Sequence, residues 1–293
     1  MRSSKVVYLY LPREVELALK EVVRCLSDIC RVRYLSDRLY KSTLHYIANR
    51  GKLIRPVLLL LTCHMLNGDL DKAIRAAVAV ECVHIASLLQ DDVFDMHRER
   101  RGVSTPRELF GDFFSILASN VFIAKAVEYS ILTGVDKVPI EIARAAIDLA
   151  DGEALELELR ESSRIDPQHY FSIIRKKTAS LIEAAMVIGA YLSKASERDV
   201  KKVRMLGRLL GILYQVRDDI IDFLDGENEK VNIVNVFMSS GLDRDSALDK
   251  ALKILRNLFK SVDKAIDSVF GEKGQILKSL VHSNLRLHIA DLF

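Results

Sequence analysis

The sequence lacks most features of a nucleic-acid-binding, secreted or membrane-spanning protein. Its net charge is only +3, and no dense run of lysine and arginine interleaved with aromatic residues occurs, which argues against a nucleic-acid partner. Apolar runs such as residues 57–61 are far shorter than a membrane span. The apolar part of residues 1–14 is too short and too interrupted to predict a signal peptide. We therefore expect a cytoplasmic protein without a transmembrane segment.

Cysteine is scarce, and its spacing predicts neither disulfides nor a zinc site. The four cysteines, Cys25, Cys30, Cys63 and Cys82, form no Cys-x-x-Cys pair, and all lie in apolar helical stretches. We interpret them as reduced thiols in the core of a cytosolic protein.

Proline and glycine are also scarce, and no low-complexity linker divides the chain. Apolar residues recur every three or four positions, and strand-like alternation is nearly absent. Thr105-Pro106 and Asp166-Pro167 are typical of helix N-termini, because the first residue caps and the proline fits the first turn. We expect an all-α fold, a single large bundle of about ten or more mostly antiparallel helices in one domain over residues 1–293. The expected helices cover residues 13–49 with a break near 35, 56–67, 71–96, 106–132, 139–163, 167–194, 197–224, 230–240, 243–270 and 273–291.

Two copies of the pattern Asp-Asp-x-x-Asp occur, at residues 91–95 and 218–222. Residues four apart share a helix face, so the first and last aspartates of each cluster project together. Each cluster ends a long apolar helix, which would place its carboxylates at the mouth of the bundle. The six carboxylates belong to Asp91, Asp92, Asp95, Asp218, Asp219 and Asp222.

Carboxylates at the end of an apolar helix require cations. Oxygen ligands, with no cysteine and few histidines nearby, suit Mg²⁺, which commonly shares its remaining positions with water and substrate phosphates. The residues therefore predict a diphosphate site between two acidic helices, with Mg²⁺ as cofactor. A solvated acidic turn with a purely structural role is the alternative.

Two polar residues share the faces of the clusters. His84 lies two turns before Asp91, and Gln215 lies about one turn before Asp218. A lone histidine on an apolar helix is more often a core residue, but this alignment favours a contact with the ligand.

Three basic segments could supply the cations that diphosphates need besides metal. Lys52 and Arg55 lie at a loop-to-helix junction, where a helix N-terminus also favours an anion. Arg100 and Arg101 follow the first aspartate cluster, and Lys177 lies in the middle of a later helix. These cations are too many for one diphosphate, so we expect two diphosphate substrates.

With these motifs in this order, the chain resembles the trans-polyprenyl diphosphate synthase family over about residues 45–235. The resemblance implies an all-helical homodimer with a deep central cavity, in which Mg²⁺ helps to ionise an allylic diphosphate that then joins isopentenyl diphosphate. It also implies that all six aspartates bind metal and take part in catalysis. It assigns isopentenyl diphosphate to Lys52, Arg55, His84 and Arg101, the allylic diphosphate to Arg100, Lys177 and Lys230, and positions near the reacting carbons to Lys177, Thr178 and Gln215.

The resemblance also bears on product length. In the family the product grows beside the helix of the first cluster, and a bulky residue four or five positions before the first aspartate forms a floor. Here Ala86 and Ser87 occupy those positions, with Cys82 and Val83 one turn deeper. These small residues predict a product of C20 or longer. A wall from another helix, for example at Phe113, Phe114 or Phe122, keeps geranylgeranyl diphosphate open.

Other functions stay open at this point. A non-catalytic subunit of a heteromeric synthase is one, although such chains commonly lose an aspartate cluster. A carboxylate-bridged di-iron protein is another, because Glu81 and His84 form a Glu-x-x-His motif, but such sites need two of these motifs. A terpene cyclase also uses an aspartate-rich cluster, whereas the basic set favours chain elongation.

Overall fold

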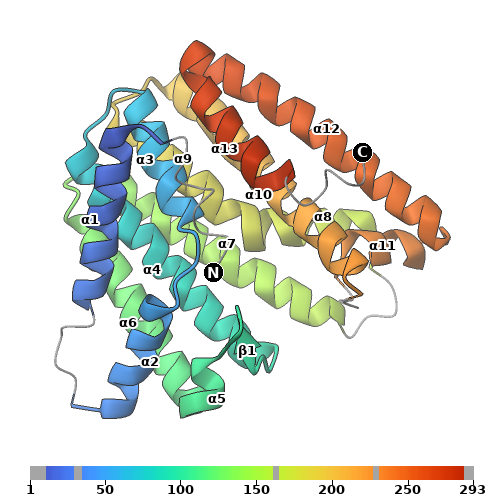
Figure 1. The fold of residues 1–293 in the computed structure, drawn as a ribbon, viewed down its shortest axis with the longest axis horizontal. Helices are drawn as coiled ribbons and strands as arrows, with labels where there is room; N and C mark the ends of the chain where they lie inside the picture. Colours follow the sequence, from blue (N-terminus) through green and yellow to red (C-terminus); the bar gives the residue numbers. More distant parts are fainter. Residues whose placement is uncertain (1–10, 30–34, 161–164, 227–230, 287–293) are drawn as a thin grey trace.

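The computed structural model describes residues 11–29, 35–160, 165–226 and 231–286, and within them it is a helical bundle (Figure 1). The predicted all-α class is confirmed, and the described strands form a single hairpin of β1 (Glu99–Arg100) and β2 (Val103–Ser104). The α-helices are α1 (Arg13–Ile29), α2 (Asp37–Ala48), α3 (Ile54–Met65), α4 (Leu70–Phe94), α5 (Pro106–Phe110), α6 (Asp112–Ile131), α7 (Lys137–Arg160), α8 (Pro167–Ile174), α9 (Ser180–Leu192), α10 (Glu197–Leu224), α11 (Ile233–Ser239), α12 (Arg244–Phe270) and α13 (Gln275–Arg286).

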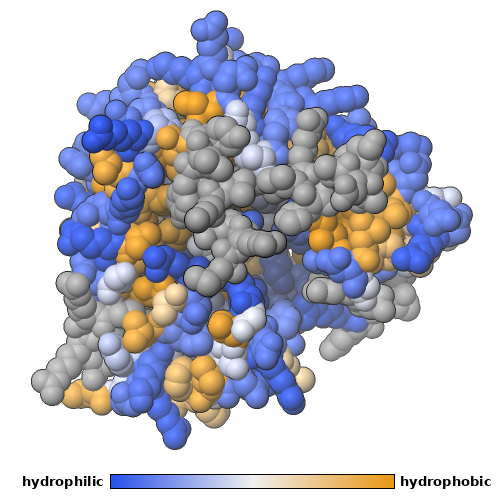
Figure 2. Space-filling view, in the orientation of Figure 1, coloured by the Kyte–Doolittle hydropathy of each residue, from blue (hydrophilic) through white to orange (hydrophobic). Residues whose placement is uncertain are grey.

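Helix α4, which carries the first aspartate cluster, lies in the interior of the bundle. It packs against α1, α3, α6, α7 and α9, and its residues from Ala73 to Leu89 are mostly buried. The second cluster ends α10, which packs against α9 and α12, and α12 and α13 form one edge of the molecule (Figure 1). Figure 2 shows the same face with hydrophilic residues along most of its outline and hydrophobic patches between them.

Two described helices, α4 and α6, are long and apolar enough to cross a membrane by length and composition alone. In α4, 72% of the apolar window is buried inside the bundle, as expected for a core helix. In α6 only 33% of that window is buried, so this helix carries apolar side chains on its outer face.

The predicted helix starts at Thr105 and Asp166 are confirmed by their caps. The Thr105 hydroxyl accepts a hydrogen bond from the Glu108 amide at 3.3 Å, and the Asp166 carboxylate accepts one from the His169 amide at 2.9 Å. In a full capping box the Glu108 side chain would also accept a hydrogen bond from the Thr105 amide. That amide instead donates to the carbonyl of Arg98.

The helix predicted over residues 106–132 is divided. Gly111 has φ +92° and ends α5 after five residues, and α6 starts at the next residue. Glycine tolerates a positive φ that residues with a side chain rarely adopt. The break turns α6 so that its buried face packs along α4.

The helix predicted over residues 167–194 is likewise interrupted, by a π-helical turn called η1 (Arg175–Ala179). Two glycines let other helices approach this turn closely. A Cβ atom on Gly152 of α7 would lie 2.6 Å from the amide nitrogen of Lys177, and one on Gly211 of α10 would lie 2.4 Å from the Cα of Ala179. Wide turns of this kind are frequent at functional sites, and here η1 presents Lys177 to the interior.

Gly152→Ala is therefore expected to destabilise the fold although alanine favours helices. The added methyl group would overlap the backbone of η1, and overpacking of this kind costs about 1–3 kcal/mol. Thermal unfolding followed by circular dichroism measures the effect, with Glu158→Gln on the exposed face of α7 as the control. Equal melting temperatures for both variants would show that η1 can shift to accommodate the methyl group without a loss of stability.

Candidate active site

A cavity of about 860 Å³ lies between the two aspartate helices and α3. It collects most of the residues that the sequence singled out, from segments that are far apart along the chain. Among its lining residues are Lys52, Arg55, His84, Ser87, Asp91, Arg100, Arg101, Lys177, Thr178, Gln215 and Asp218.

One wall of this cavity is strongly cationic. Lys52 and Arg55 lie at the N-terminus of α3, next to Leu53, whose φ of +51° turns the chain into the helix. Burial and neighbouring cations lower the pKa of Arg55 and Arg101. For the same reasons the pKa of His84 lies well below its usual value. Because few acidic groups balance these cations, this wall of the cavity is suited to bind an anionic ligand.

Glu81 lies among these cations and was not assigned to them from the sequence. It is 3% exposed, burial raises its pKa to about 7, and Arg55 and Arg101 act in the opposite direction. Its Oε2 atom has no hydrogen-bond partner in the described structure. With arginines as neighbours, Glu81 and His84 do not form the half-site of a di-iron centre.

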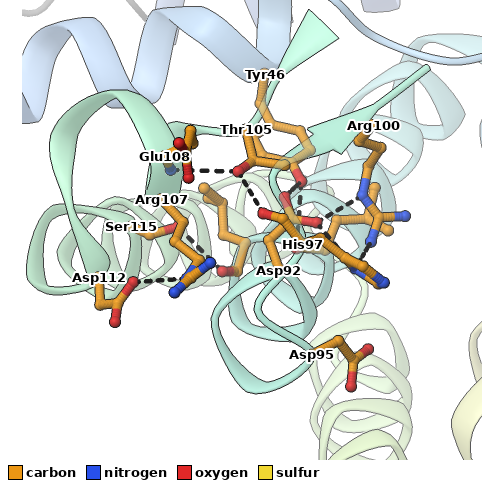
Figure 3. Close-up of polar contacts among 12 residues, drawn as sticks. Tyr46, Asp92, Asp95, His97, Arg100, Thr105, Arg107, Glu108, Asp112 and Ser115 are labelled. Carbon is orange, nitrogen blue, oxygen red and sulfur yellow. Dashed lines mark hydrogen bonds and ion pairs between the residues drawn. The ribbon is translucent and has the colours of Figure 1, made fainter. Parts of the chain in front are cut away.

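The three carboxylates of the first cluster lie in different surroundings. Asp92 is fully buried, where the Tyr46 hydroxyl donates to its Oδ2 atom and Arg100 Nε donates to its Oδ1 atom at 2.8 Å (Figure 3). Asp95 points away from this group (Figure 3) and accepts a hydrogen bond from Arg160. Asp91 faces the cavity, and burial raises its pKa to about 7 although Lys177 acts in the opposite direction.

Lys177 connects the first cluster to two glutamates of α7. Its Nζ atom lies 2.7 Å from Glu153 and 2.8 Å from Glu156, and these charges together with Asp91 raise its pKa. The neighbouring Lys176 instead pairs with the exposed Asp151. The π turn thus places Lys177 in the cavity and directs Lys176 away from it, toward the exposed Asp151.

The second cluster is divided in a similar way. Asp218 lines the cavity with a half-exposed side chain, beside Arg217. Asp219 is 3% exposed and accepts hydrogen bonds from Tyr170 and Gln215, each at 2.7 Å. Asp222 is half-buried one turn further along α10. Lys230, the remaining predicted cation, lies outside the described residues.

A second cavity of about 310 Å³ adjoins the first and is mostly apolar. Val83 and Ser87, two of the four positions predicted to set the product length, line it together with residues of α6 and α7. Ala86 and Cys82 are buried in the core and line neither cavity. The reason is helical geometry, because 83, 87, 90 and 94 follow one face of α4, and positions 86 and 82 are turned from the middle of that face by about 70° and 110°.

Several residues with direct contacts to the site were missed from the sequence. The carboxylates of Glu153 and Glu156 were detectable in principle, since Asp-Gly-Glu-x-x-Glu places two acidic residues one helical turn apart in an apolar helix. Tyr46, Tyr170 and Arg160 carry no local signal, because their partners are 46, 49 and 65 residues away in sequence.

The carboxylates at the cavity are suited to a divalent cation that is coordinated partly by the protein and partly by a bound ligand. Among the described residues no three acidic, histidine or cysteine side chains are gathered into a closed metal site. Asp91 on α4 and Asp218 on α10 instead border the same cavity, and Mg²⁺ is usually bound by one or two carboxylates together with substrate phosphates. The raised pKa of Asp91 reflects a carboxylate whose surroundings favour an additional cation.

The fold is all-helical, and its large cavity combines carboxylates from two helices with a cationic wall and adjoins an apolar cavity. These features are typical of an enzyme that acts on hydrocarbons carrying a diphosphate group. The sequence matches the polyprenyl synthetase family over residues 36–234. The chain therefore belongs to this family and is a trans-prenyl diphosphate synthase.

Individual relatives agree with this assignment. Geranylfarnesyl diphosphate synthase of Methanosarcina mazei is 33% identical over 250 residues, which are 83% of this chain and 81% of the relative. Geranylgeranyl diphosphate synthase of Sulfolobus acidocaldarius is 31% identical over 218 residues, which are 71% of this chain and 66% of the relative. The structure of a Caulobacter crescentus polyprenyl synthase, complexed with calcium and isoprenyl diphosphate, aligns with a TM-score of 0.85 over 97% of each chain at 23% identity.

Proposed function

We propose that this chain condenses an allylic prenyl diphosphate with isopentenyl diphosphate to give a product of C20 or longer. The observation that carries the proposal is the cavity that α4 and α10 line with carboxylates and that also holds the cations Lys52, Arg55, Arg100, Arg101 and Lys177. Isopentenyl diphosphate would bind at Lys52, Arg55, His84 and Arg101, and the allylic diphosphate beside Arg100 and Lys177.

The chemistry follows from this arrangement. The allylic carbon–oxygen bond breaks and its electron pair leaves with the diphosphate, where Arg100 and Lys177 stabilise the developing negative charge. The double bond of isopentenyl diphosphate supplies the electron pair for the new carbon–carbon bond, and the departing diphosphate accepts the released proton. The apolar lining of the second cavity offers water few partners, which protects the allylic cation from capture once the prenyl chain fills the cavity.

Mg²⁺ is the proposed cofactor. The side chains that would hold it are Asp91 and Asp95 on α4 and Asp218 and Asp222 on α10, with diphosphate oxygens completing its coordination. When bound, Mg²⁺ neutralises the charge that develops on the leaving diphosphate. Asp92 and Asp219, which were also predicted as ligands, are buried and hydrogen bonded to tyrosines, so we assign them to positioning.

The purified chain, incubated alone with farnesyl diphosphate, isopentenyl diphosphate and Mg²⁺, is expected to form longer prenyl diphosphates. Chromatography of the dephosphorylated products measures their length. Absence of product from the chain alone, with product after addition of a partner chain, would favour the non-catalytic subunit instead.

The product is expected to shorten when the apolar cavity is filled. Val83→Phe places an aromatic ring in the 310 Å³ cavity, so chains should terminate at least one isoprene unit earlier. Ala86→Phe is the matched control on the same helix, and it should lower stability without a shorter product, because Ala86 lines neither cavity. If only the Ala86 variant gave a shorter product, Ala86 and not Val83 would be the residue that limits product length.

We further propose a homodimer through the outer face of α6 and α7. Exposed apolar residues follow the outer face of α6 at helical spacing, and Ile140 and Ile147 continue the apolar surface on α7. Ile123, itself exposed, also lines the apolar cavity, so a second copy would complete the wall of that cavity. The α6 residues are Phe113, Leu117, Val127 and Ile131.

Ile147→Asp is expected to convert the dimer to a monomer, because it places a charge in the most exposed part of the apolar surface on α7. Sedimentation velocity measures the change. Leu17→Asp on α1, which is 54% exposed against 69% for Ile147, serves as the control and should remain dimeric. A monomeric wild-type protein would contradict this assignment.

A further inference from the structure

Asp219 joins three structural elements through direct hydrogen bonds. Its Oδ1 atom accepts from Gln215 Nε2 at 2.7 Å, and its Oδ2 atom accepts from the Tyr170 hydroxyl at 2.7 Å and from the Ile233 amide at 3.0 Å. Its backbone carbonyl accepts from Asn232 Nδ2 at 2.6 Å. Because the side chain is 3% exposed and surrounded by donors from α8, α10 and the start of α11, its orientation is fixed.

These contacts also fix the amide of Gln215. A carboxylate can only accept hydrogen bonds, so the NH₂ group of Gln215 must face Asp219. The Oε1 atom of Gln215 then faces Thr178, whose hydroxyl donates to it at 2.7 Å. Thr178 and Gln215 both line the large cavity, whereas Asp219 does not.

The direction of this chain of hydrogen bonds determines what Thr178 offers to a ligand. A hydroxyl that donates its proton to Gln215 keeps its oxygen lone pairs for a positively charged neighbour in the cavity. If the amide were turned, Thr178 would accept from Gln215, and its proton would point elsewhere. The first orientation stabilises a developing carbocation, and the second opposes it.

We propose that Asp219 is a positioning residue that sets the amide of Gln215 and, through it, the hydroxyl of Thr178 toward the allylic cation. This inference rests on the proposed prenyl transfer, in which the allylic cation would form beside Thr178. The first cluster has the same arrangement, because buried Asp92 is held by Tyr46 and in turn holds Arg100, which reaches the cavity. The second aspartate of each cluster thus orients a polar group instead of binding metal.

Asp219→Asn tests the direction of the chain. The substituted oxygen would serve Tyr170 and the Ile233 amide, so the new NH₂ group would face Gln215 and turn its amide. We expect kcat to fall about 10²-fold, as for small misplacements of reacting groups, with the half-saturating Mg²⁺ concentration unchanged. Asp218→Asn is the matched control beside it and should raise the half-saturating Mg²⁺ concentration.

The double variant Asp219→Asn with Gln215→Glu restores the original direction. The carboxylate now lies at position 215, where it accepts from both the new NH₂ group and Thr178, and the total charge is unchanged. We expect kcat to recover about tenfold over D219N, and the melting temperature to recover as well, since the donors and acceptors match again. A role of Asp219 as a metal ligand predicts no recovery.

The outcomes separate this inference from the function on which it rests. A wild-type chain that forms no product overturns the proposed function, whereas the melting temperatures of the single and double variants still test the hydrogen-bond chain. If D219N does not fold, Tyr170→Phe removes one donor to Asp219 and should lower kcat at constant Mg²⁺ dependence. A shift in Mg²⁺ dependence for D219N or Y170F, or no recovery in the double variant, overturns the positioning role.

Discussion

Lys177→Met is expected to reduce prenyl transfer about 10³-fold and to lower stability, whereas Lys176→Met should change neither appreciably. Lys177 is the cation between Glu153, Glu156 and the cavity, and its removal leaves the nearly buried Glu153 without this partner and Glu156 with Arg160 alone. Breaking a buried pair in this way costs about 3–5 kcal/mol. The loss of rate follows from the missing charge beside the leaving diphosphate.

Lys176 provides a control one residue away. Its partners Asp148 and Asp151 have side chains that are 49% and 59% exposed, and surface ion pairs contribute about 0–1 kcal/mol. Steady-state kinetics and thermal unfolding of both variants measure the difference. Similar losses for the two lysines would contradict the assignment of η1 as the element that selects which lysine enters the site.

Asp91→Asn is expected to have the second large effect, a fall in kcat of about 10³-fold together with a higher requirement for Mg²⁺. Asp91 lines both cavities, and its carboxylate is held in surroundings that raise its pKa to about 7. The amide keeps the shape but removes the charge that attracts the metal. We expect the substrate KM for isopentenyl diphosphate to change little, because its cationic wall is formed by other residues.

Asp225→Asn is the control for this variant. Asp225 is exposed at the end of α10, three residues beyond the last aspartate of the second cluster, and should tolerate the change within about twofold. Kinetics at several Mg²⁺ concentrations distinguish the two variants. An Asp91 variant with normal kcat and normal Mg²⁺ dependence would contradict the proposal that Asp91 on α4 binds the metal.

Sequence patterns predicted the helical bundle and the helix starts because those depend on nearby residues. Thr105 and Asp166 cap their helices as predicted, and the two clusters lie at the ends of α4 and α10. The break at Gly111 and the π turn were missed. The first depends on a backbone angle, and the second on how closely α7 and α10 approach η1.

The division of labour within each cluster could not be predicted from the sequence. The pattern Asp-Asp-x-x-Asp presents three equivalent carboxylates, but Tyr46 and Tyr170 come from distant helices and bind the second aspartate of each cluster. Helical periodicity also left the wall of the apolar cavity undecided, because Val83, Cys82 and Ala86 are all small and only packing shows which one faces it.

The most direct test of the central claim is the Mg²⁺ dependence of product formation by the wild-type chain alone. With an allylic diphosphate and isopentenyl diphosphate, elongated product should appear only with Mg²⁺, and a chelator should stop the reaction reversibly. Elongation that continues undiminished in excess chelator, or its absence at every Mg²⁺ concentration, would contradict the claim that facing aspartate helices bind metal-complexed diphosphate.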